Sequence, residues 1–305
     1  MRPREIFDAH HHFWHLSSGG DGHYPWLQDR YDPDFFLGDY RAMCHDFLPD
    51  DLRARYANWN LVGSVHVEAE RSRSEQVAET RWLAGLHART GLPSLIVGHV
   101  FFTQPDRDEV LEGHAACPLV RGIRSKPMIA AHPGLSVRGQ PGSLQDPAFA
   151  EGLSRLERFG FSWDLRVPFW HLAEAAELLA QFPRIPVVLN HLGLPLDRSP
   201  EALAVWRQGI EAVAAQPQTV LKVSELGLHG GRWDAGSNRA VIRDAVATFG
   251  IERCMFASNL PVSGLSVSLD ELIDTVLAAL PDASQDEIDG LFAGNARRFY
   301  RADPA

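Results

Sequence analysis

Residues 8–14 read Asp-Ala-His-His-His-Phe-Trp and end an apolar stretch that begins at Ile6, which we interpret as the first β-strand of the chain. Side chains alternate across a strand, so His10 and His12 point to one side and His11 points to the other. Two imidazoles that converge on one small volume can hold a metal ion or bind and polarise a carbonyl oxygen. The pair therefore predicts a functional site at the end of the first strand.

Similar short apolar runs, rich in β-branched residues, recur along the chain with helical patterns between them. The expected strands cover residues 6–13, 62–68, 95–101, 119–126, 161–167, 187–191, 220–225 and 254–259. The expected helices cover residues 74–90, 147–159, 171–182, 201–216, 238–249 and 284–300, the last of which closes the bottom of a barrel. We predict an α/β fold, a (β/α)8 TIM barrel, formed as a single domain over residues 1–305.

The composition narrows the classes of partner. With 45% hydrophobic residues, 22% charged residues and a formal net charge of -10, the chain is typical of a globular protein and lacks the basic excess that a nucleic-acid binder needs. Neither a membrane span nor a signal peptide is visible, so we expect a cytoplasmic protein. Cys44, Cys117 and Cys254 lack any CxxC spacing and predict neither disulfides nor a thiolate metal site. The expected partner is a small molecule, and a homodimer is left open.

In a barrel of this kind, functional residues collect at the carboxyl ends of the strands. The polar residues expected there are His66, Glu68, Arg124, Lys126, Asp164, Arg166, His191, Lys222, Glu225 and Asn259. Arg124 and Lys126 lie two residues apart and face one way, so they either grip a substrate carboxylate or pair with Glu68 or Asp164. Glu68, Arg166 and Glu225 are further candidates for substrate binding.

Long connections follow several strands, over residues 16–40, 128–146 and 227–237, and are candidates for a lid and for substrate recognition. Trp14 and Trp26, near the first-strand pair, either stack on a substrate ring or pack structurally. His229 and Trp233 are lid candidates in the stretch after the seventh strand.

Several motifs, taken in order, resemble the amidohydrolase superfamily, in the branch of sugar-acid lactonases and 2-pyrone-4,6-dicarboxylate lactonase. The motifs are the first-strand stretch quoted above, Tyr-Pro-Trp-Leu at 24–27, Gly-Ile-Arg at 122–124, Val-Leu-Asn-His-Leu-Gly at 188–193, Met-Phe-Ala-Ser-Asn-Leu-Pro-Val at 255–262 and Gly-Asn-Ala-Arg-Arg-Phe-Tyr at 294–300. The resemblance implies a (β/α)8 barrel and hydrolysis of a lactone or related ester by water.

The resemblance also implies a divalent metal on the first-strand histidines, with further histidines from strands five and six and an Asp from strand eight. Here His10, His12 and His191 match, but the fifth strand contains no histidine. Lactonases of this branch work without a metal or depend little on one. We therefore expect either no cofactor or one divalent metal, Zn or Mn, held by His10 and His12.

The strand-eight position departs from the family pattern, because Asn259 stands where the family has an Asp that takes a proton from the attacking water. An Asn side chain cannot accept that proton. Three alternatives remain: another base acts (His191, Glu68 or Glu225); the reaction needs no activated water, as in decarboxylation of an aromatic acid; or the barrel binds a ligand without catalysis.

Our working hypothesis is a hydrolase that opens a small lactone or cyclic ester, one that carries a carboxylate of the sugar-acid or aromatic-catabolism type. In it, His10 and His12 polarise the carbonyl, directly or through a metal, and His191 orients or deprotonates water. Asn259 positions the water, and Arg124 with Lys126 binds the substrate anion.

Overall fold

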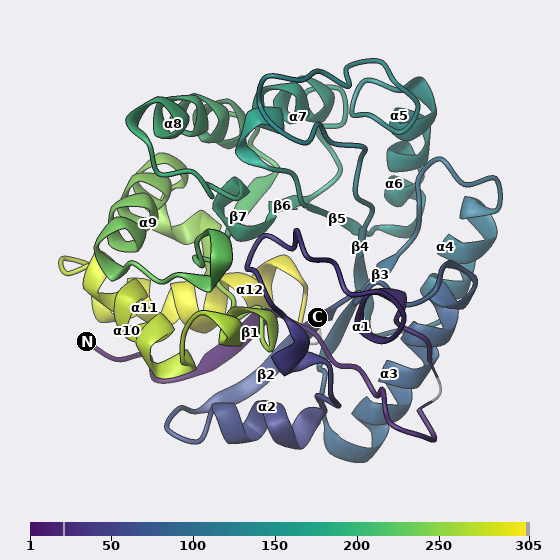
Figure 1. Ribbon diagram of the computed structural model, residues 1–305, viewed down its shortest axis with the longest axis horizontal. Helices are drawn as coiled ribbons and strands as arrows, with labels where there is room; N and C mark the ends of the chain where they lie inside the picture. Colours follow the sequence, from purple (N-terminus) through teal and green to yellow (C-terminus); the bar gives the residue numbers. More distant parts are fainter. Residues whose placement is uncertain (21, 303–305) are drawn as a thin grey trace.

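Eight parallel strands pair in the order in which they occur along the chain in the computed structural model, which describes residues 1–20 and 22–302. The strands are β1 (Ile6–His11), β2 (Leu61–Val67), β3 (Leu95–His99), β4 (Val120–Arg124), β5 (Ser162–Leu165), β6 (Val187–Leu189), β7 (Thr219–Val223) and β8 (Cys254–Phe256). Helices surround them (Figure 1). The predicted (β/α)8 barrel is confirmed. The single domain over residues 1–305 stays a prediction, and residues 21 and 303–305 lie outside the described part of the chain.

Hydrogen bonds between the end of β1 and the segment that follows β8 close the barrel. The backbone N–H of Asn259 donates to the carbonyl of His10 at 2.7 Å, and the N–H of His12 donates to the carbonyl of Leu260 at 2.8 Å. The buried carboxylate of Asp8 accepts from both the backbone N–H of Ser258, at 2.8 Å, and its hydroxyl, at 2.6 Å. The aspartate of the opening motif therefore anchors the strand-eight motif.

Side chains cap several of the helices; the hydroxyl of Ser199, for example, accepts from the N–H of Ala202 at 3.3 Å. They are α1 (Pro25–Gln28), α2 (Pro49–Arg55), α3 (Gln76–Thr90), α4 (Arg107–Ala115), α5 (Pro147–Ser154), α6 (Leu156–Phe159), α7 (Leu172–Leu179), α8 (Pro200–Ala214), α9 (Ala235–Phe249), α10 (Leu269–Ala279), α11 (Gln285–Asp289) and α12 (Asn295–Phe299). The sequence analysis missed α1, α2, α4 and α10. In α4 only Leu111 and His114 are buried, so its apolar pattern is weak.

The predicted last helix over 284–300 is three pieces, because a π-helical segment over Gly290–Gly294 separates α11 from α12. This end of the chain packs below β1 and β8, and the hydroxyl of Tyr300 donates to the carboxylate of Asp164 inside the barrel. The C-terminal segment thus closes the bottom, as predicted. No helix in the described residues is long and apolar enough to cross a membrane.

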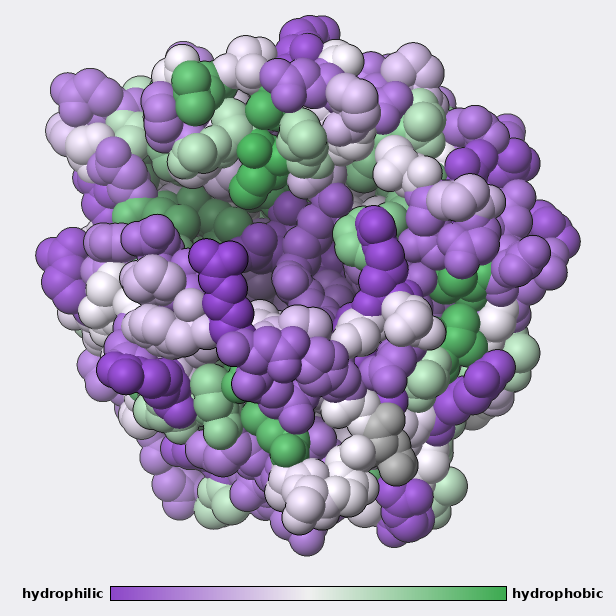
Figure 2. Space-filling model, turned by 45° about the vertical axis from the view of Figure 1, so that its right-hand side comes forward, coloured by the Kyte–Doolittle hydropathy of each residue, from purple (hydrophilic) through white to green (hydrophobic). Residues whose placement is uncertain are grey.

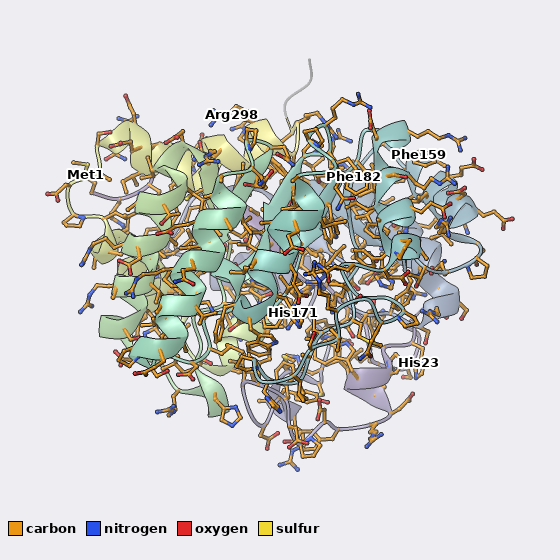
Figure 3. All side chains as sticks on the ribbon, turned by 90° about the horizontal axis from the view of Figure 1, so that it is seen from above. Met1, His23, Phe159, His171, Phe182 and Arg298 are labelled. Carbon is orange, nitrogen blue, oxygen red and sulfur yellow. The ribbon has the colours of Figure 1, made fainter. Side chains whose placement is uncertain are left out.

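The two ends of the barrel differ in what covers them. Figure 3 shows His23 and His171 at one end, and Phe159, Phe182 and Arg298 at the other. His171 directly precedes α7, and Phe182 follows the same helix, so the His23 end is the one to which the carboxyl ends of the strands point. The long segment after β1, which includes α1, lies over this end.

Candidate active site

A cavity of about 260 Å³ opens at the carboxyl ends of the strands. Figure 2 shows a hollow in the molecular surface with hydrophilic residues inside it. The cavity is lined by residues that follow β1, β2, β4, β5, β6, β7 and β8 together with the long segment after β1: His12, Trp26, Asp32, Phe35, Phe36, Tyr40, Ala69, Glu70, Arg124, Lys126, Arg166, His191, Glu225, Asn259 and Val262.

Most of the predicted site residues meet at this cavity. Those on its wall are His12, Trp26, Arg124, Lys126, Arg166, His191, Glu225 and Asn259. His10 and Glu68 lie directly behind the wall and are fully buried. Trp14 does not line the cavity; its indole N–H donates to the carbonyl of His45 at 2.7 Å and its side chain is fully buried. Packing rather than substrate stacking is therefore the role that its position supports.

Neighbouring groups determine which ring nitrogen carries the proton in the pair His10 and His12. Nδ1 of His12 lies 2.7 Å from the carbonyl of Val67, which can only accept, so Nδ1 carries the proton and Nε2 keeps a lone pair. That lone pair faces Nε2 of His10 at 3.3 Å. Burial, reinforced by the charge of Arg124, lowers the pKa of His12 well below its usual range. A neutral His12 of this tautomer accepts at Nε2, and polarisation of a carbonyl oxygen by His10 and His12 stays a prediction.

The side chains around the pair do not fit a divalent metal. Among the described residues, no group of three His, Cys, Asp or Glu side chains is arranged so that it could hold a metal ion. Arg124 Nη1 lies 3.5 Å from Nε2 of His10, and Lys222 Nζ lies 3.4 Å from Nδ1 of the same ring. These two cationic groups repel a divalent ion and occupy both ring nitrogens of His10. The predicted Zn or Mn ion at His10 and His12 is therefore not supported by this donor set.

Two of the three cations on the cavity wall already hold a carboxylate. Arg124 donates from Nε to Glu68 Oε1 at 2.5 Å, and Lys126 forms an ion pair with Glu70. Burial alone would raise the pKa of Glu68, but the charges of Arg124 and Lys126 lower it to about 2. The pairing with Glu68 is thus the alternative that the structure realises for Arg124.

Arg166, by contrast, makes no hydrogen bond or ion pair with any described residue. Burial, together with the charge of Arg124, lowers its pKa to about 10, so it remains charged at neutral pH. A half-buried guanidinium without a partner presents its N–H donors to whatever occupies the cavity. Arg166 is therefore the cavity-wall cation whose donors no described residue takes, and the binding of a substrate anion by Arg124, Lys126 and Arg166 stays a prediction.

Sequence reasoning missed an aromatic wall that faces these cations. Phe35, Phe36 and Tyr40 line the cavity beside Trp26, whose ring lies 6.2 Å from that of Phe35 in a stacked arrangement. The Tyr40 hydroxyl donates to the carbonyl of Trp26 at 2.9 Å and fixes the segment. The available signal was the density of aromatic residues in the long connection over 16–40.

The other long connections do not line the cavity in the described structure. Residues 227–237, which include the lid candidates His229 and Trp233, support the first connection from behind, through a bond from the N–H of Gly230 to the carbonyl of Phe36 at 3.2 Å. The connection over 128–146 packs instead against the start of α7, where the N–H of Ala130 donates to His171 at 2.8 Å.

The remaining wall holds His191, Glu225 and Asn259, which follow β6, β7 and β8. Nδ1 of His191 lies 2.9 Å from the Ser224 hydroxyl, and burial, then the charge of Arg166, lowers the pKa of His191 well below its usual range. The Asn259 side-chain amide donates to Oε2 of Glu225. Burial raises the pKa of Glu225 to about 7, even though this bond and Arg166 act in the opposite direction.

Known proteins resemble the chain over nearly its full length. A Sinorhizobium fredii protein, the uncharacterized y4mH, is 34% identical over 97% of this chain and 98% of its own. An L-fucono-1,5-lactonase of Burkholderia ambifaria is 27% identical over 97% of this chain and 95% of its own. A Burkholderia multivorans amidohydrolase, solved with bound Zn, superimposes with a TM-score of 0.79 at 27% identity, covering 97% of this chain and 99% of that one.

The family model described as Amidohydrolase matches residues 7–302, a span that includes every residue lining the cavity. With the eight-stranded barrel and the polar cavity at the carboxyl ends of its strands, this match shows that the chain belongs to the amidohydrolase family.

Proposed function

We propose that this chain is a carboxylic ester hydrolase that opens a small lactone bearing a carboxylate. The observation that carries the proposal is the guanidinium of Arg166, which no described residue binds, in a cavity that also contains a buried carboxyl group whose pKa burial raises to about 7, that of Glu225. The first group supplies a counter-ion for a substrate anion, and the second supplies acid–base chemistry. The L-fucono-1,5-lactonases of two Burkholderia species support the choice of a lactone.

The cavity favours one orientation of such a substrate. The carboxylate pairs with Arg166, and the ring lies against Trp26 and Phe35 on the opposite wall. The carbonyl oxygen then faces Arg124, whose guanidinium has five N–H donors, of which Glu68 takes two through its side chain and its backbone carbonyl. A volume of about 260 Å³ limits the substrate to a single ring with small substituents.

The test is a panel of lactones that differ in charge. Sugar-acid lactones without a carboxylate and pyrone or lactone carboxylates are offered at neutral pH, and hydrolysis is followed by the proton that the product acid releases. We expect turnover of a carboxylate-bearing lactone, and we expect Arg166→Met to raise KM for that substrate by about 10- to 100-fold, the value of a charge-assisted bond. For a lactone without a carboxylate, the same variant keeps its KM.

The other outcomes are equally informative. If no lactone is hydrolysed, with or without added Zn²⁺ or Mn²⁺, the hydrolase proposal is wrong. Release of CO₂ from a hydroxybenzoate would then identify a decarboxylase. Thermal stabilisation by a carboxylate without any turnover would identify a barrel that only binds its ligand.

A further inference from the structure

We propose that Glu225, which follows β7, accepts the proton of the attacking water in place of the strand-eight residue. This inference rests on the proposed function, and it names the group that does what Asn259 cannot do. It makes Glu225 a catalytic residue and Asn259 a positioning residue.

The geometry leaves one carboxylate oxygen of Glu225 for the reaction. Oε2 is occupied by the hydrogen bond from the Asn259 amide, whereas Oε1 is buried and has no hydrogen-bond partner among the described residues. Oδ1 of Asn259 is likewise buried and without a partner in the same part of the chain. Both residues line the cavity. The cavity wall thus contains a carboxyl group and an amide that are joined by one hydrogen bond and that each keep one acceptor oxygen without a partner among the described residues.

The backbone conformations of Glu225 and Asn259 indicate that the hydrogen bond between their side chains is maintained at a cost in conformational strain. Glu225 has φ 48° and Asn259 has φ 54°, so both lie in the left-handed region. Asn tolerates this region, but a glutamate does so with strain, and such strain persists mainly where surrounding structure enforces it at functional sites. Hydrogen bonds enforce it here, because the N–H of Asn259 is held by the carbonyl of His10 at 2.7 Å.

The charges around the cavity favour Glu225 over the other candidate bases. The charged or titratable groups that share the cavity with it are Arg166 after β5, His191 after β6, Arg124 and Lys126 at β4, Glu70 after β2, His12 after β1 and Asp32 in the long segment. Cations next to His191 oppose its protonation. Glu68 is held as a carboxylate by Arg124 and is a weak base. Glu225, with a pKa of about 7, is suited to take a proton and return it.

Glu225 alone can take up and return the proton that the reaction transfers. The water oxygen bonds to the lactone carbonyl carbon while one water proton passes to Oε1 of Glu225. When the tetrahedral adduct collapses, the bond between that carbon and the ring oxygen breaks, and Glu225 returns the proton to the ring oxygen to give the alcohol. The second water proton leaves when the new carboxylic acid ionises to solvent.

The experiment removes the carboxylate from position 225 and then restores a carboxylate at position 259, its hydrogen-bond partner. Glu225→Gln is expected to lower kcat/KM about 10²- to 10⁴-fold, the usual contribution of a general base. The double variant Glu225→Gln with Asn259→Asp exchanges the amide and the carboxylate, and it is expected to recover at least about tenfold of that loss. Asn259→Asp alone places two carboxyls in contact, so the acid limb of the pH profile moves to higher pH.

Glu79→Gln is the matched control. Glu79 is also fully buried with a pKa raised by burial to about 7, but it bonds the N–H of Ala69 and does not line the cavity. Glu79→Gln therefore keeps the acid limb near pH 7, and Glu225→Gln loses it. If the wild-type enzyme hydrolyses a lactone and Glu225→Gln keeps both its rate and its acid limb, the assignment of Glu225 is wrong and the proposed function stands. If the wild type hydrolyses no lactone, both fall.

Discussion

Lys222 Nζ lies 3.4 Å from Nδ1 of His10 and 2.5 Å from Oδ1 of Asp164, so one buried cation joins the first-strand pair to the interior of the barrel. An ammonium group can only donate, so Nδ1 of His10 accepts and the ring proton sits on Nε2. That N–H then points to the lone pair of His12 at 3.3 Å. Lys222, His10 and His12 thus form one chain of hydrogen bonds, whereas Arg124 Nη1, 3.5 Å from the same Nε2, meets a donor there.

The first prediction concerns metal removal. Because Lys222 fixes the proton on Nε2 of His10, binding a divalent ion there must displace that proton, and Arg124 repels the ion. We expect the purified protein to contain less than one equivalent of Zn or Mn by elemental analysis. Lactone hydrolysis should survive dialysis against a chelator. A stoichiometric ion whose removal abolishes activity, and whose return restores it, would contradict this reading.

The second prediction concerns pH. Glu225 acts as a base only when it is ionised, so kcat/KM rises with pH through about 7. Burial, together with the charge of Arg166, lowers the pKa of Lys126 to about 8, so this cation is lost above that pH. For a carboxylate substrate, kcat/KM should then fall on the alkaline side. Lys126→Arg stays charged and should remove the alkaline fall while leaving the acid limb in place, whereas an unchanged alkaline limb would exclude Lys126 as its source.

The third prediction separates the two tryptophans near the first-strand pair. Trp14 is fully buried, and Trp14→Ala should lower the free energy of unfolding by about 3–5 kcal/mol in urea titrations. Trp26 lines the cavity and is only partly buried, so Trp26→Ala should cost less stability and raise KM instead. Equal effects of the two substitutions on KM would contradict this division of roles.

The fourth prediction concerns the stability cost of Glu225. Its pKa is raised from 4.5 to about 7 in the folded state, so the folded protein binds a proton that the unfolded chain releases. Stability is therefore present below pH 4.5 and is lost as the pH rises through about 7. The loss at pH 8 is about 3 kcal/mol at most. Glu225→Gln should accordingly be more stable than the wild type at pH 8, an advantage that shrinks at pH 5. A variant that is less stable than the wild type at pH 8 would point to a structural role for Glu225.

The barrel was predictable because its signals are local. Each strand is a short apolar run, and the residues at its end, such as His12, Arg124 and Asn259, are fixed by the topology alone. Partners across the barrel are not local. Nothing in the sequence near Arg124 shows that Glu68 holds it, or that Arg166 has no hydrogen-bond or ion-pair partner within residues 1–20 and 22–302.

The sequence also could not show which side chains reach the cavity. Strand alternation correctly brings His10 and His12 together, but only the packing of Arg124 against His10 decides that His12 alone reaches the cavity. The aromatic wall of Phe35, Phe36 and Tyr40 comes from a connection without periodicity, where the path of the chain is set by tertiary contacts. Trp14 and Trp26 look equivalent in the sequence because tertiary contacts decide which of the two lines the cavity.

The bond from Asn259 to the carbonyl of His10 ties residues from opposite ends of the chain. During synthesis the first strand leaves the ribosome long before the last, and until Asn259 arrives neither the water-binding wall nor the seam of the barrel exists. A chain that stops before β8 therefore has an exposed strand edge at β1 as well as no active site. Completion of the chain, hydrolytic competence and protection from aggregation should arrive together.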